Sequence, residues 1–427
     1  MVMKYHIWTI GCQMNQADSW RAAEELDSLG WESTGRPEDA DLVLLNTCVV
    51  RQSAEDKAYG RLGSLKPLKR HHPQAAIVVM GCLVGEDTGA LERSFPFVDL
   101  FLRPSDVEGL IGFAAERWGT GPSSSPDAAQ DAPVCAYVPV MEGCNNHCTY
   151  CIVRLRRGRE QSRSIDDIVQ EVHCLVQRGA REVTLLGQNV DAYGHDLPGQ
   201  PNLADLLRSV HEVDDLWRIR FLTSHPNDMS ERIIEAVAEL GNVCEHIELP
   251  VQAGHDLTLK RMGRGYTVDQ YARLLSRIRE RIPGAAVATD VIVGFPGETR
   301  DHFQATFDLL AQERFDVVHI AAYSPRPGTP AARLEDDVLS PEKERRRRLI
   351  EELQRQVSSE INHRLLGSAT EVLVEEKHKG RWKGRSRGNK LVFFEDDGNW
   401  RGRLAQVEIT WAGPWSLLGK VIAPHPA

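Results

Sequence analysis

Short apolar runs alternate along the chain with longer segments in which apolar residues recur every three or four positions. The first pattern predicts buried strands and the second predicts amphipathic helices. In the first third of the chain, strands are expected at 4–9, 42–46 and 76–80, and a helix is expected at about 19–29. A helix-length segment separates each strand from the next, so this third is predicted to be an α/β domain with a doubly wound parallel sheet.

The same alternation continues through the middle of the chain. Strands are expected at 136–140, 183–186, 218–222, 246–249, 287–293 and 317–321, and helices at 165–178, 203–213, 231–240, 268–281 and 300–313. The clearest helix begins after Ser164, which can cap it, and ends before Gly179. Six strand-to-helix units predict a partial (βα)6 barrel, whose chemistry would lie in the loops after the strands.

The last quarter of the chain has a different pattern, with one long helix followed by short β-type segments. A helix is expected to start at Ser340-Pro341, and it carries apolar residues at Leu349, Leu353, Val357 and Ile361. Beyond Thr370, short β-type segments at 371–374, 392–394, 407–411 and 418–422 predict a small antiparallel β-barrel of the OB type. The Gly/Pro/Ser-rich stretch 119–133 reads as a linker. We therefore expect domains at 1–118, 134–365 and 366–427, with the linker after the first.

Composition narrows the class of protein. The chain has 427 residues, of which 41% are hydrophobic and 26% are charged, as in soluble proteins with several cores. It has no apolar run of about 18 residues and no signal-peptide pattern, so a cytoplasmic location without membrane contact is expected. Nine cysteines, without an export signal, favour metal binding over disulfides. The net charge of −10 gives no overall reason to expect a nucleic-acid partner.

Three cysteines gather on one short loop, Cys144, Cys148 and Cys151, in the pattern C-x-x-x-C-x-x-C. An iron–sulfur cubane normally takes four thiolates, so three would leave one iron open to an outside molecule. With His147 between them, the same cysteines could instead form a Cys₃His zinc site. That histidine adjoins Cys148, a cramped geometry for a shared metal, and the iron–sulfur interpretation is favoured.

A second trio follows the three strands of the first domain. Cys12, Cys48 and Cys82 each lie just past a strand, roughly 35 residues apart, which is about one βαβ unit. Loops after parallel strands gather along one edge of the sheet, so these cysteines should converge. Buried structural cysteines are the alternative. Their equivalent placement favours a second metal site with three thiolates.

These motifs carry a resemblance to a known family. The C-x-x-x-C-x-aromatic-C loop resembles that of the radical S-adenosylmethionine superfamily. Gly11-Cys12-Gln13-Met14-Asn15 and Asn46-Thr47-Cys48-Val49-Val50-Arg51 resemble the methylthiotransferases within it. The closest branch acts on tRNA N6-isopentenyladenosine, because the threonylcarbamoyladenosine and ribosomal-protein branches differ after the first or second cysteine.

The resemblance implies a function and its partners. It implies addition of a 2-methylthio group to N6-isopentenyladenosine at position 37, beside the anticodon, with two S-adenosylmethionine molecules and two 4Fe-4S clusters. The auxiliary cluster at Cys12, Cys48 and Cys82 would carry the sulfur, and the cluster at Cys144, Cys148 and Cys151 would generate a 5′-deoxyadenosyl radical. Implied partners are the tRNA, an electron donor such as flavodoxin or ferredoxin, and a sulfur source. No catalytic base is assigned.

Two other functions remain open. The same chemistry could act on threonylcarbamoyladenosine in tRNA or on a ribosomal protein. A non-catalytic RNA-binding metalloprotein is the competitor from another class.

The resemblance also implies contacts to S-adenosylmethionine. They are carried over to Tyr150, Gly187, Gln188, Asn189, Ser224, Gln252 and Asp290. A structural role remains open for Ser224 and Asp290. His225 could contact substrate or simply be a hydrogen-bonded turn residue.

Basic residues supply the remaining candidates. Near the C-terminus the set comprises Lys377, Lys379, Arg381, Lys383, Arg385, Arg387 and Lys390, with Trp382 among them. Cationic loops and aromatics on small barrels bind oligonucleotides, and the segment resembles the RNA-binding TRAM domain; a solvated hairpin is the alternative.

After the cluster loop, Arg154, Arg156, Arg157 and Arg159 could bind phosphate. The family usually has Pro and an aromatic residue where Arg154 and Leu155 stand. Core packing is expected for Cys135, Cys174 and Cys244.

Overall fold

The structure, a computed structural model, describes residues 2–50, 52–119 and 132–424. Arg51 and most of the predicted linker, 120–131, lie outside the described residues. The chain divides into two compact units. The first comprises Met1–Asp131, Glu142–Asn146 and Cys151–Glu160, and the second comprises Ala132–Met141, His147–Tyr150 and Gln161–Ala427.

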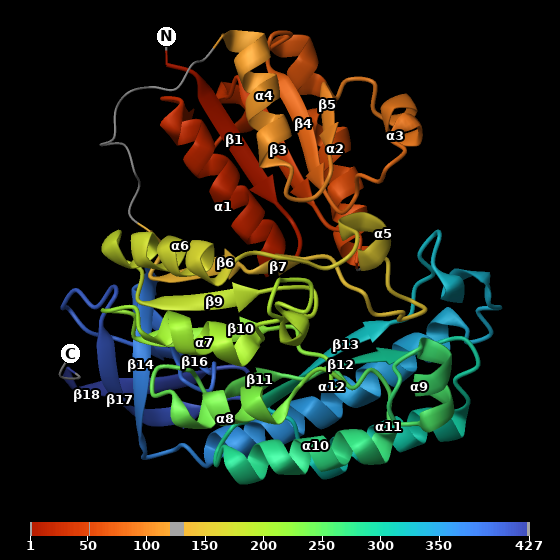
Figure 1. Ribbon diagram of the computed structural model, residues 1–427, viewed down its shortest axis with the longest axis vertical. Coiled ribbons are helices and arrows are strands. Elements are labelled where there is room, and N and C mark those ends of the chain that lie inside the picture. The colour runs from red at the N-terminus through yellow and green to blue at the C-terminus, as the bar shows by residue number, and fades with distance from the viewer. Residues whose placement is uncertain (1, 51, 120–131, 425–427) are drawn as a thin grey trace. The chain divides into compact units, whose positions relative to one another are not determined.

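The first unit is built on a five-stranded parallel sheet in the order β2-β1-β3-β4-β5 (Figure 1). Its strands are β1 (Lys4–Thr9), β2 (Glu32–Ser33), β3 (Leu42–Thr47), β4 (Ala76–Gly81) and β5 (Leu100–Leu102). Successive residues of β3 enter opposite cores: Leu42 and Leu44 pack on one face, and Val43 and Leu45 on the other. Both faces are therefore apolar, as a parallel sheet with helices on both sides requires. The predicted doubly wound α/β fold is confirmed.

Helices cover both faces of this sheet. The helices α1 (Gln13–Ser28) and α4 (Val107–Trp118) pack on the face of Leu42, and α2 (Gln52–His71) packs on the other. This unit also contains two short helices, η1 (Pro37–Asp39) and α3 (Gly89–Ser94). Helix α1 starts directly after Cys12, earlier than predicted, because Asn15 caps it by accepting from the Cys12 N–H. Its first turns bury polar side chains, so they lack the hydrophobic period that marks a helix in the sequence.

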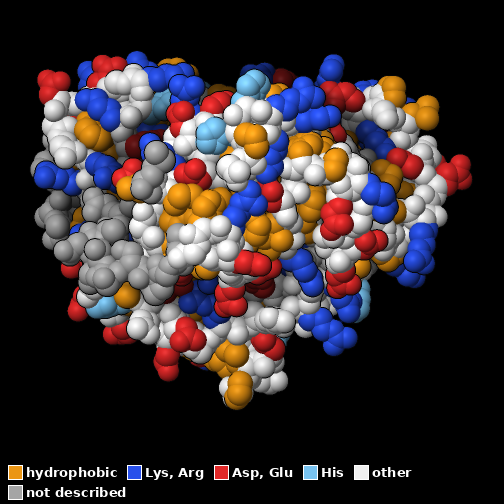
Figure 2. Space-filling view, turned by 90° about the horizontal axis from the view of Figure 1, so that it is seen from above, with side chains coloured by type: hydrophobic (Ala, Val, Ile, Leu, Met, Phe, Trp, Pro, Cys, Tyr) orange, Lys and Arg blue, Asp and Glu red, His pale blue; other side chains and the backbone are white. Residues whose placement is uncertain are grey.

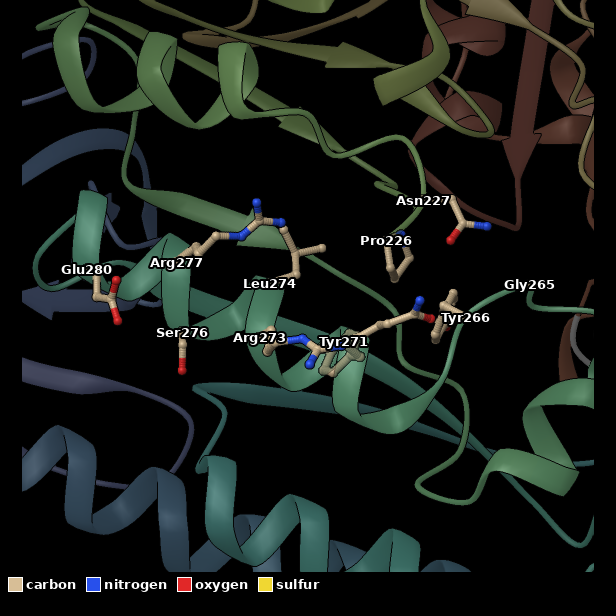
Figure 3. A pocket seen from close by; sticks show the side chains of 11 residues that line it. Pro226, Asn227, Gly265, Tyr266, Tyr271, Arg273, Leu274, Ser276, Arg277 and Glu280 are labelled. Carbon is tan, nitrogen blue, oxygen red and sulfur yellow. The ribbon is translucent and has the colours of Figure 1, made fainter.

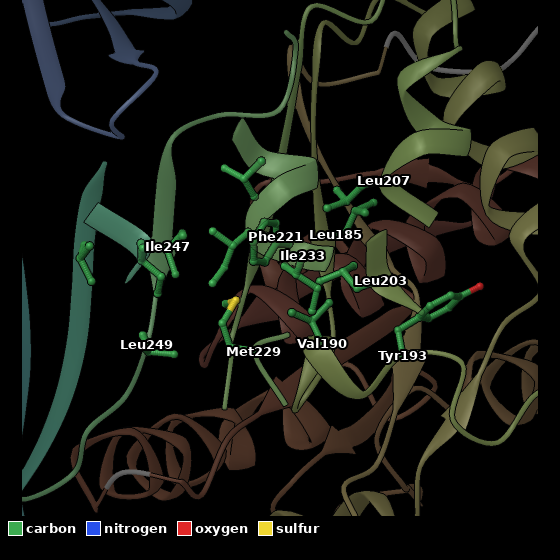
Figure 4. Close-up of a cluster of buried hydrophobic side chains, with 14 of the residues drawn as sticks. Leu185, Val190, Tyr193, Leu203, Leu207, Phe221, Met229, Ile233, Ile247 and Leu249 are labelled. Atoms are coloured by element: carbon green, nitrogen blue, oxygen red, sulfur yellow. The ribbon is translucent and has the colours of Figure 1, made fainter. Parts of the chain in front are cut away.

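The second unit contains the predicted partial barrel. Two parallel three-stranded sheets, β10-β9-β6 and β11-β12-β13, are joined by a bridge between Ile219 and Val243. The six strands are β6 (Cys135–Pro139), β9 (Glu182–Leu186), β10 (Arg218–Leu222), β11 (His246–Glu248), β12 (Ala286–Val293) and β13 (Val317–Ala322). Figure 4 shows Leu185, Phe221 and Ile247 from three of these strands within one apolar core.

The helices of this unit agree with the predicted ranges to within about two residues. They are α6 (Ile165–Gln177), α7 (Leu203–His211), α8 (Glu231–Glu239), α10 (Val268–Arg281) and α11 (Arg300–Glu313). The sequence pattern did not predict α9 (Asp256–Met262) of this unit, nor α5 (Val153–Arg157), which belongs to the first unit; both are one or two turns long. The remaining short elements are β7 (Met141–Glu142), β8 (Gln161–Ser162), η3 (Val190–Ala192) and η4 (Pro330–Arg333).

Helix α12 (Ser340–His363) leads into the C-terminal barrel and buries only part of the stripe that the sequence suggested. Val357 is 3% exposed and Leu353 packs against the core, whereas Leu349 is 39% exposed. Lys343, Arg346 and Ile350 are buried as well. The two buried cations are paired: Lys343 Nζ lies 2.6 Å from an Asp336 carboxylate oxygen, and Arg346 Nη1 lies 2.7 Å from Glu298 Oε2. The Arg346–Glu298 pair therefore ties this helix to the loop after β12, and the Lys343–Asp336 pair ties it to the segment that precedes it.

The C-terminal barrel closes in the order β14-β15-β16-β18-β17. Its strands are β14 (Ala369–His378), β15 (Arg381–Ser386), β16 (Leu391–Phe394), β17 (Leu404–Ala412) and β18 (Leu417–Pro424). The predicted small barrel is confirmed, with one correction, because β16 and β18 pair in parallel and not antiparallel. The other strand pairs of the barrel are antiparallel.

The surface carries mixed charge. Acidic and basic side chains are interspersed on the face shown in Figure 2. Across the part of the chain that the structure describes, no helix combines the length and the apolar character needed to cross a membrane.

Candidate iron–sulfur and S-adenosylmethionine sites

Cys12, Cys48 and Cys82 follow β1, β3 and β4 at the carboxyl edge of the first sheet. Hydrogen bonds tie their loops together: Asn15 Nδ2 donates to the Thr47 carbonyl over 3.1 Å, and Cys82 N–H donates to the same carbonyl over 2.9 Å. A Cβ atom added to Gly11 would lie 2.8 Å from Cys48 Cβ, so only glycine allows this approach. The three loops converge as expected.

The environment of these thiols suits a cation. Cys48 and Cys82 are each 4% exposed, and Cys12 is exposed. Burial, reinforced by Cys82, raises the pKa of the Cys48 thiol to about 12. Burial also raises the pKa of Cys82, and the positive charge of Arg157 opposes that rise. Metal ligands must be thiolates, and the charge of bound iron offsets the cost of burying them. The trio therefore fits an iron–sulfur cluster.

A single-ion site is a different matter. Among the residues described, no group of three or more His, Cys, Asp or Glu side chains could hold one metal ion. The zinc alternative needs such a group, because its four ligands must meet at one ion. A cubane cluster offers a separate iron to each thiolate, so its ligands are more widely spread.

The second trio lies on a loop that both units share. Cys144 and Cys151 belong to the first unit and Cys148 belongs to the second. In the first unit, Cys144 N–H donates to the Gly158 carbonyl over 3.2 Å. Gly143 has φ of +76°, and a Cβ there would lie 1.9 Å from the Arg159 carbonyl oxygen. The chain that follows α5 thus fixes the start of the cysteine loop.

In the second unit, Arg264 lies against Cys148. The guanidinium is buried; its Nη1 donates to Cys148 Sγ over 3.3 Å and its Nη2 to the Pro250 carbonyl over 3.0 Å. Its Nε donates to the Tyr266 hydroxyl over 2.9 Å. The guanidinium therefore holds the sulfur of a predicted cluster ligand by a direct hydrogen bond. Sequence reasoning missed Arg264, which is remote from the cysteine loop and belongs to no pattern that marks a ligand.

The residues predicted to contact S-adenosylmethionine gather at the strand ends of the partial barrel. Gly187, Gln188 and Asn189 follow β9, and Ser224 follows β10. Gln252 follows β11, and its N–H donates to the carbonyl of Asp290 within β12 over 2.8 Å. Tyr150 packs edge-on against Phe295 at a centroid distance of 6.4 Å.

Two of these residues present buried atoms without a partner. Asn189 Oδ1 and Gln252 Oε1 are buried and accept no hydrogen bond from the described chain. Such atoms are rare in native proteins and mark places where a ligand or water supplies the donor. They fit a bound molecule with amino or hydroxyl groups, such as S-adenosylmethionine. Ser224 differs, because its hydroxyl donates to Asp191 Oδ1 over 2.9 Å.

Two titratable groups beside Ser224 are uncharged near neutral pH. Burial raises the pKa of Asp191 to about 8, although hydrogen bonds from Ser224 and the His225 N–H oppose the rise. Burial, helped by Arg264, lowers the pKa of His225 to about 3. His225 Nδ1 accepts from the Asn227 N–H over 3.2 Å, so the proton is on Nε2. That Nε2 is buried and has no partner within the described residues.

A cavity of about 610 Å³ lies beside this loop (Figure 3). Pro226, Asn227 and Tyr266 line one end, and Arg277 and Glu280 of α10 line the other. The residues predicted to contact S-adenosylmethionine are not among those that line it. A second cavity, of about 680 Å³, lies between the partial barrel and the C-terminal barrel.

Six of the seven basic residues near the C-terminus separate into two groups. We define the inner group as Arg385, Arg387 and Lys390. Arg387 donates to both Glu245 carboxylate oxygens over 2.7 and 2.8 Å, and Lys390 Nζ to Asp316 over 2.8 Å, so these two cations join the C-terminal barrel to the partial barrel.

The rest of the set lies around the turn between β14 and β15, which includes Lys379. We define the outer group as Lys377, Lys379 and Arg381. Lys383, on β15, pairs with Glu376. Trp382 is 7% exposed, and its Nε1 donates to the Asp396 carbonyl, so it belongs to the core and offers no ring face to a base.

The structure also bears on two other sets of sequence candidates, the arginines after the cluster loop and the remaining cysteines. The Arg157 side chain is 2% exposed and paired with Asp18, so it is not a phosphate ligand at the surface. Of the remaining cysteines, Cys244 is buried and Cys135 partly buried. The expectation of core packing is wrong for Cys174, which is exposed.

Comparison with known proteins places these features in a family. The profile of the radical SAM superfamily matches residues 138–310, that of the uncharacterized protein family UPF0004 matches residues 4–103, and that of the TRAM domain matches residues 363–422. A tRNA-2-methylthio-N(6)-dimethylallyladenosine synthase from Roseiflexus sp. (strain RS-1) is 51% identical over 423 residues, which are 97% of this chain and 89% of the relative. The chain belongs to this synthase family.

Other relatives of the family agree. The synthase from Herpetosiphon aurantiacus is 47% identical over 98% of this chain and 97% of its own, and that from Chloroflexus aurantiacus is 49% identical over 97% and 91%. Members of the family thus match the chain across both cysteine trios and the C-terminal barrel.

Solved structures resemble the chain in fold alone. A radical S-adenosylmethionine methyltransferase from Kitasatospora setae, solved with cobalamin and an iron–sulfur cluster, matches with a TM-score of 0.57 at 14% identity, over 78% of this chain and 77% of its own. A cobalamin-dependent S-adenosylmethionine radical enzyme matches with a TM-score of 0.52 at 11% identity, over 82% and 56%.

Proposed function

We propose that this protein is a tRNA methylthiotransferase that adds a 2-methylthio group to N6-isopentenyladenosine at position 37, next to the anticodon. The observation that carries the proposal is the 51% identity over 97% of the chain with a synthase of that name. The six cysteines in two trios supply the ligands that such chemistry requires. The enzyme uses S-adenosylmethionine and iron–sulfur clusters, in keeping with its family.

We assign one 4Fe-4S cluster to Cys12, Cys48 and Cys82 and the other to Cys144, Cys148 and Cys151. When bound, the clusters and S-adenosylmethionine supply the sulfur, the methyl group and the radical that activates C2–H. The chain holds and orients these groups. Arg264 donates to Cys148. The buried, unpartnered oxygens of Asn189 and Gln252, which follow β9 and β11, are assigned as acceptors for S-adenosylmethionine.

The loop after β10 is positioned by Asp191, which accepts from the Ser224 hydroxyl and from the His225 N–H. Because Asp191 and His225 are both neutral near pH 7, the buried loop carries no unpaired charge. His225 Nε2–H is then a donor available to a bound ligand. Ser224 serves this loop, and a direct ligand contact is assigned to Asn189 and Gln252 instead.

For the tRNA we propose the outer group, Lys377, Lys379 and Arg381, as phosphate contacts. These residues surround an exposed turn, whereas Arg387 and Lys390 are engaged with the partial barrel. In the domain division proposed from the sequence, residues 1–118 hold the auxiliary cluster, residues 134–365 hold the S-adenosylmethionine site, and residues 366–427 contact the tRNA. An electron donor such as flavodoxin or ferredoxin, a sulfur source and a cytoplasmic location complete the proposal, since tRNA is modified there.

Nucleoside analysis of tRNA from a deletion strain tests the substrate. The expected result is loss of 2-methylthio-N6-isopentenyladenosine, with the unmethylthiolated nucleoside in its place. The intact gene should restore it and a Cys148→Ala gene should not. Loss of the methylthio derivative of threonylcarbamoyladenosine, or of a modified ribosomal protein, would favour the other branches. A colourless anaerobic preparation with zinc and no iron would favour the non-catalytic metalloprotein.

A further inference from the structure

Arg157 ends α5, and its guanidinium is buried beside the first cysteine trio. Its side chain is 2% exposed. Nη2 lies 3.1 Å from Asp18 Oδ2, and Nη1 lies 3.6 Å from Glu142 Oε1 and donates to Ser105 Oγ over 3.0 Å. Asp18 is itself fully buried and also accepts from Ser105 over 2.7 Å. The guanidinium is therefore held on two sides by the first unit.

The same guanidinium lies at the edge of the sheet that carries the cysteines. Ser105 follows β5, and Asp18 lies on α1, which begins directly after Cys12. The positive charge of Arg157 opposes the rise in the pKa of Cys82 that burial causes, and it acts in the same direction on the pKa of Cys48. Charge and hydrogen bonds around a cluster help to set its reduction potential, because reduction adds one negative charge.

We propose that Arg157 is a positioning residue that raises the reduction potential of the auxiliary cluster by stabilising its reduced, more negative state. The assignment rests on the proposed function, in which Cys12, Cys48 and Cys82 hold that cluster. Arginine suits the position because its planar fork donates to Asp18 and Ser105 at once. Lysine would keep the charge and lose part of this geometry.

The segment that carries Arg157 also supports the other cysteine loop. The Gly158 carbonyl accepts from Cys144 N–H over 3.2 Å, and Glu160 accepts from the Asn145 N–H and side-chain amide over 2.9 and 2.8 Å. Changes at Arg157 can therefore disturb both clusters. The test must use a protein that holds only the auxiliary cluster.

The experiment uses the full chain with Cys144, Cys148 and Cys151 replaced by alanine, reconstituted anaerobically. Arg157→Gln, Arg157→Lys and Arg157→Gln/Asp18→Asn are compared in this background. Arg159→Gln is the matched control, because it removes the same charge from an exposed side chain two residues away. Iron content and a redox titration followed by electron paramagnetic resonance are the readouts.

The background should hold about four irons per chain. At the potential where its cluster is half reduced, Arg157→Gln should lower the ratio of reduced to oxidised cluster about tenfold, which is a shift of about −59 mV for one electron. Arg157→Lys should recover much of the shift, and Arg159→Gln should show none. The double variant should retain the lowered potential without leaving Asp18 as an unpaired buried charge.

Three results would overturn the assignment. The first is an unchanged potential in Arg157→Gln with iron retained, which would leave the proposed function intact. The second is loss of iron from both Arg157→Gln and the double variant, which would make the role structural. The third is a background without iron, which would contradict the proposed function as well.

Discussion

The division of the basic residues into an outer and an inner group predicts two separable phenotypes. Reversing outer charges, in Lys379→Glu/Arg381→Glu, should weaken tRNA binding and spare the fold. Arg381 forms an ion pair with Glu395, and the two side chains are 49% and 71% exposed, so that pair is worth at most about 1 kcal/mol. Lys379 lies at an exposed turn with φ of +49°.

The magnitude for tRNA follows from counterion release. Each lost phosphate contact lowers the slope of log K against log salt by about 0.7 to 0.9, so two contacts should lower it by roughly 1.5. The dissociation constant at about 0.1 M salt should rise at least tenfold. Filter binding or fluorescence anisotropy over a series of salt concentrations measures both quantities.

The matched inner variant is Arg387→Met. It removes three hydrogen bonds to Glu245 and one to the Val243 carbonyl, and leaves those acceptors partly buried. Loss of such charge-assisted bonds costs roughly 2 to 4 kcal/mol of stability. Its melting temperature should fall while the salt slope stays unchanged. Equal losses of slope in the two variants, or an unchanged slope in the outer variant, would refute this division.

Three further predictions concern the sites themselves. The pKa of Asp191 is raised from its ordinary value to about 8 in the folded chain, so its stabilising contribution is full below about pH 4 and is lost as pH rises toward 8. Asp191→Asn should therefore make the melting temperature depend less on pH between pH 5 and 8, and an equally steep dependence would count against the assignment. Gln252→Ala removes a buried acceptor and should weaken S-adenosylmethionine binding about tenfold in equilibrium dialysis, whereas the exposed Gln304→Ala should not. Gly143→Ala would place Cβ 1.9 Å from the Arg159 carbonyl oxygen and should cost about half of the bound iron, while Gly112→Ala in α4, with open space around it, should keep all of it; full iron in Gly143→Ala would mean that the loop tolerates a displaced backbone.

The strands of the partial barrel were predictable because most are short runs rich in apolar and β-branched residues. Ala286–Val293, for example, agrees with its predicted range to within one residue. The six cysteines were recognisable because their spacing is a chemical pattern that survives without tertiary information. Convergence of the first trio also followed from topology, since parallel strands bring their carboxyl ends to one edge.

Tertiary contacts decided what the sequence pattern could not. Strand β15 was missed because its inward positions are Trp382, Gly384 and Ser386, which give little hydrophobic alternation. Arg157 and Arg264 belonged to ordinary basic stretches, and only the fold shows that each guanidinium is buried beside a cysteine. Buried charges follow partners that are distant in sequence, and a hydrophobic pattern does not record them.

The S-adenosylmethionine contacts were predictable only in part. Strand-end positions identified Asn189 and Gln252, whose unpartnered oxygens are visible only in three dimensions. Ser224 has the same kind of position, yet its hydroxyl is satisfied by Asp191. A residue type at a strand end therefore identifies a candidate, and the hydrogen-bond partners decide its role.

The most direct test of the account is the iron and acid-labile sulfide content of three anaerobically reconstituted proteins. They are the intact chain, the chain with Cys12, Cys48 and Cys82 replaced by alanine, and the chain with Cys144, Cys148 and Cys151 replaced. Two independent clusters predict about eight irons for the first protein and about four for each of the others. Loss of all iron from either substituted chain, or a full complement in both, would contradict the assignment of one cluster to each trio.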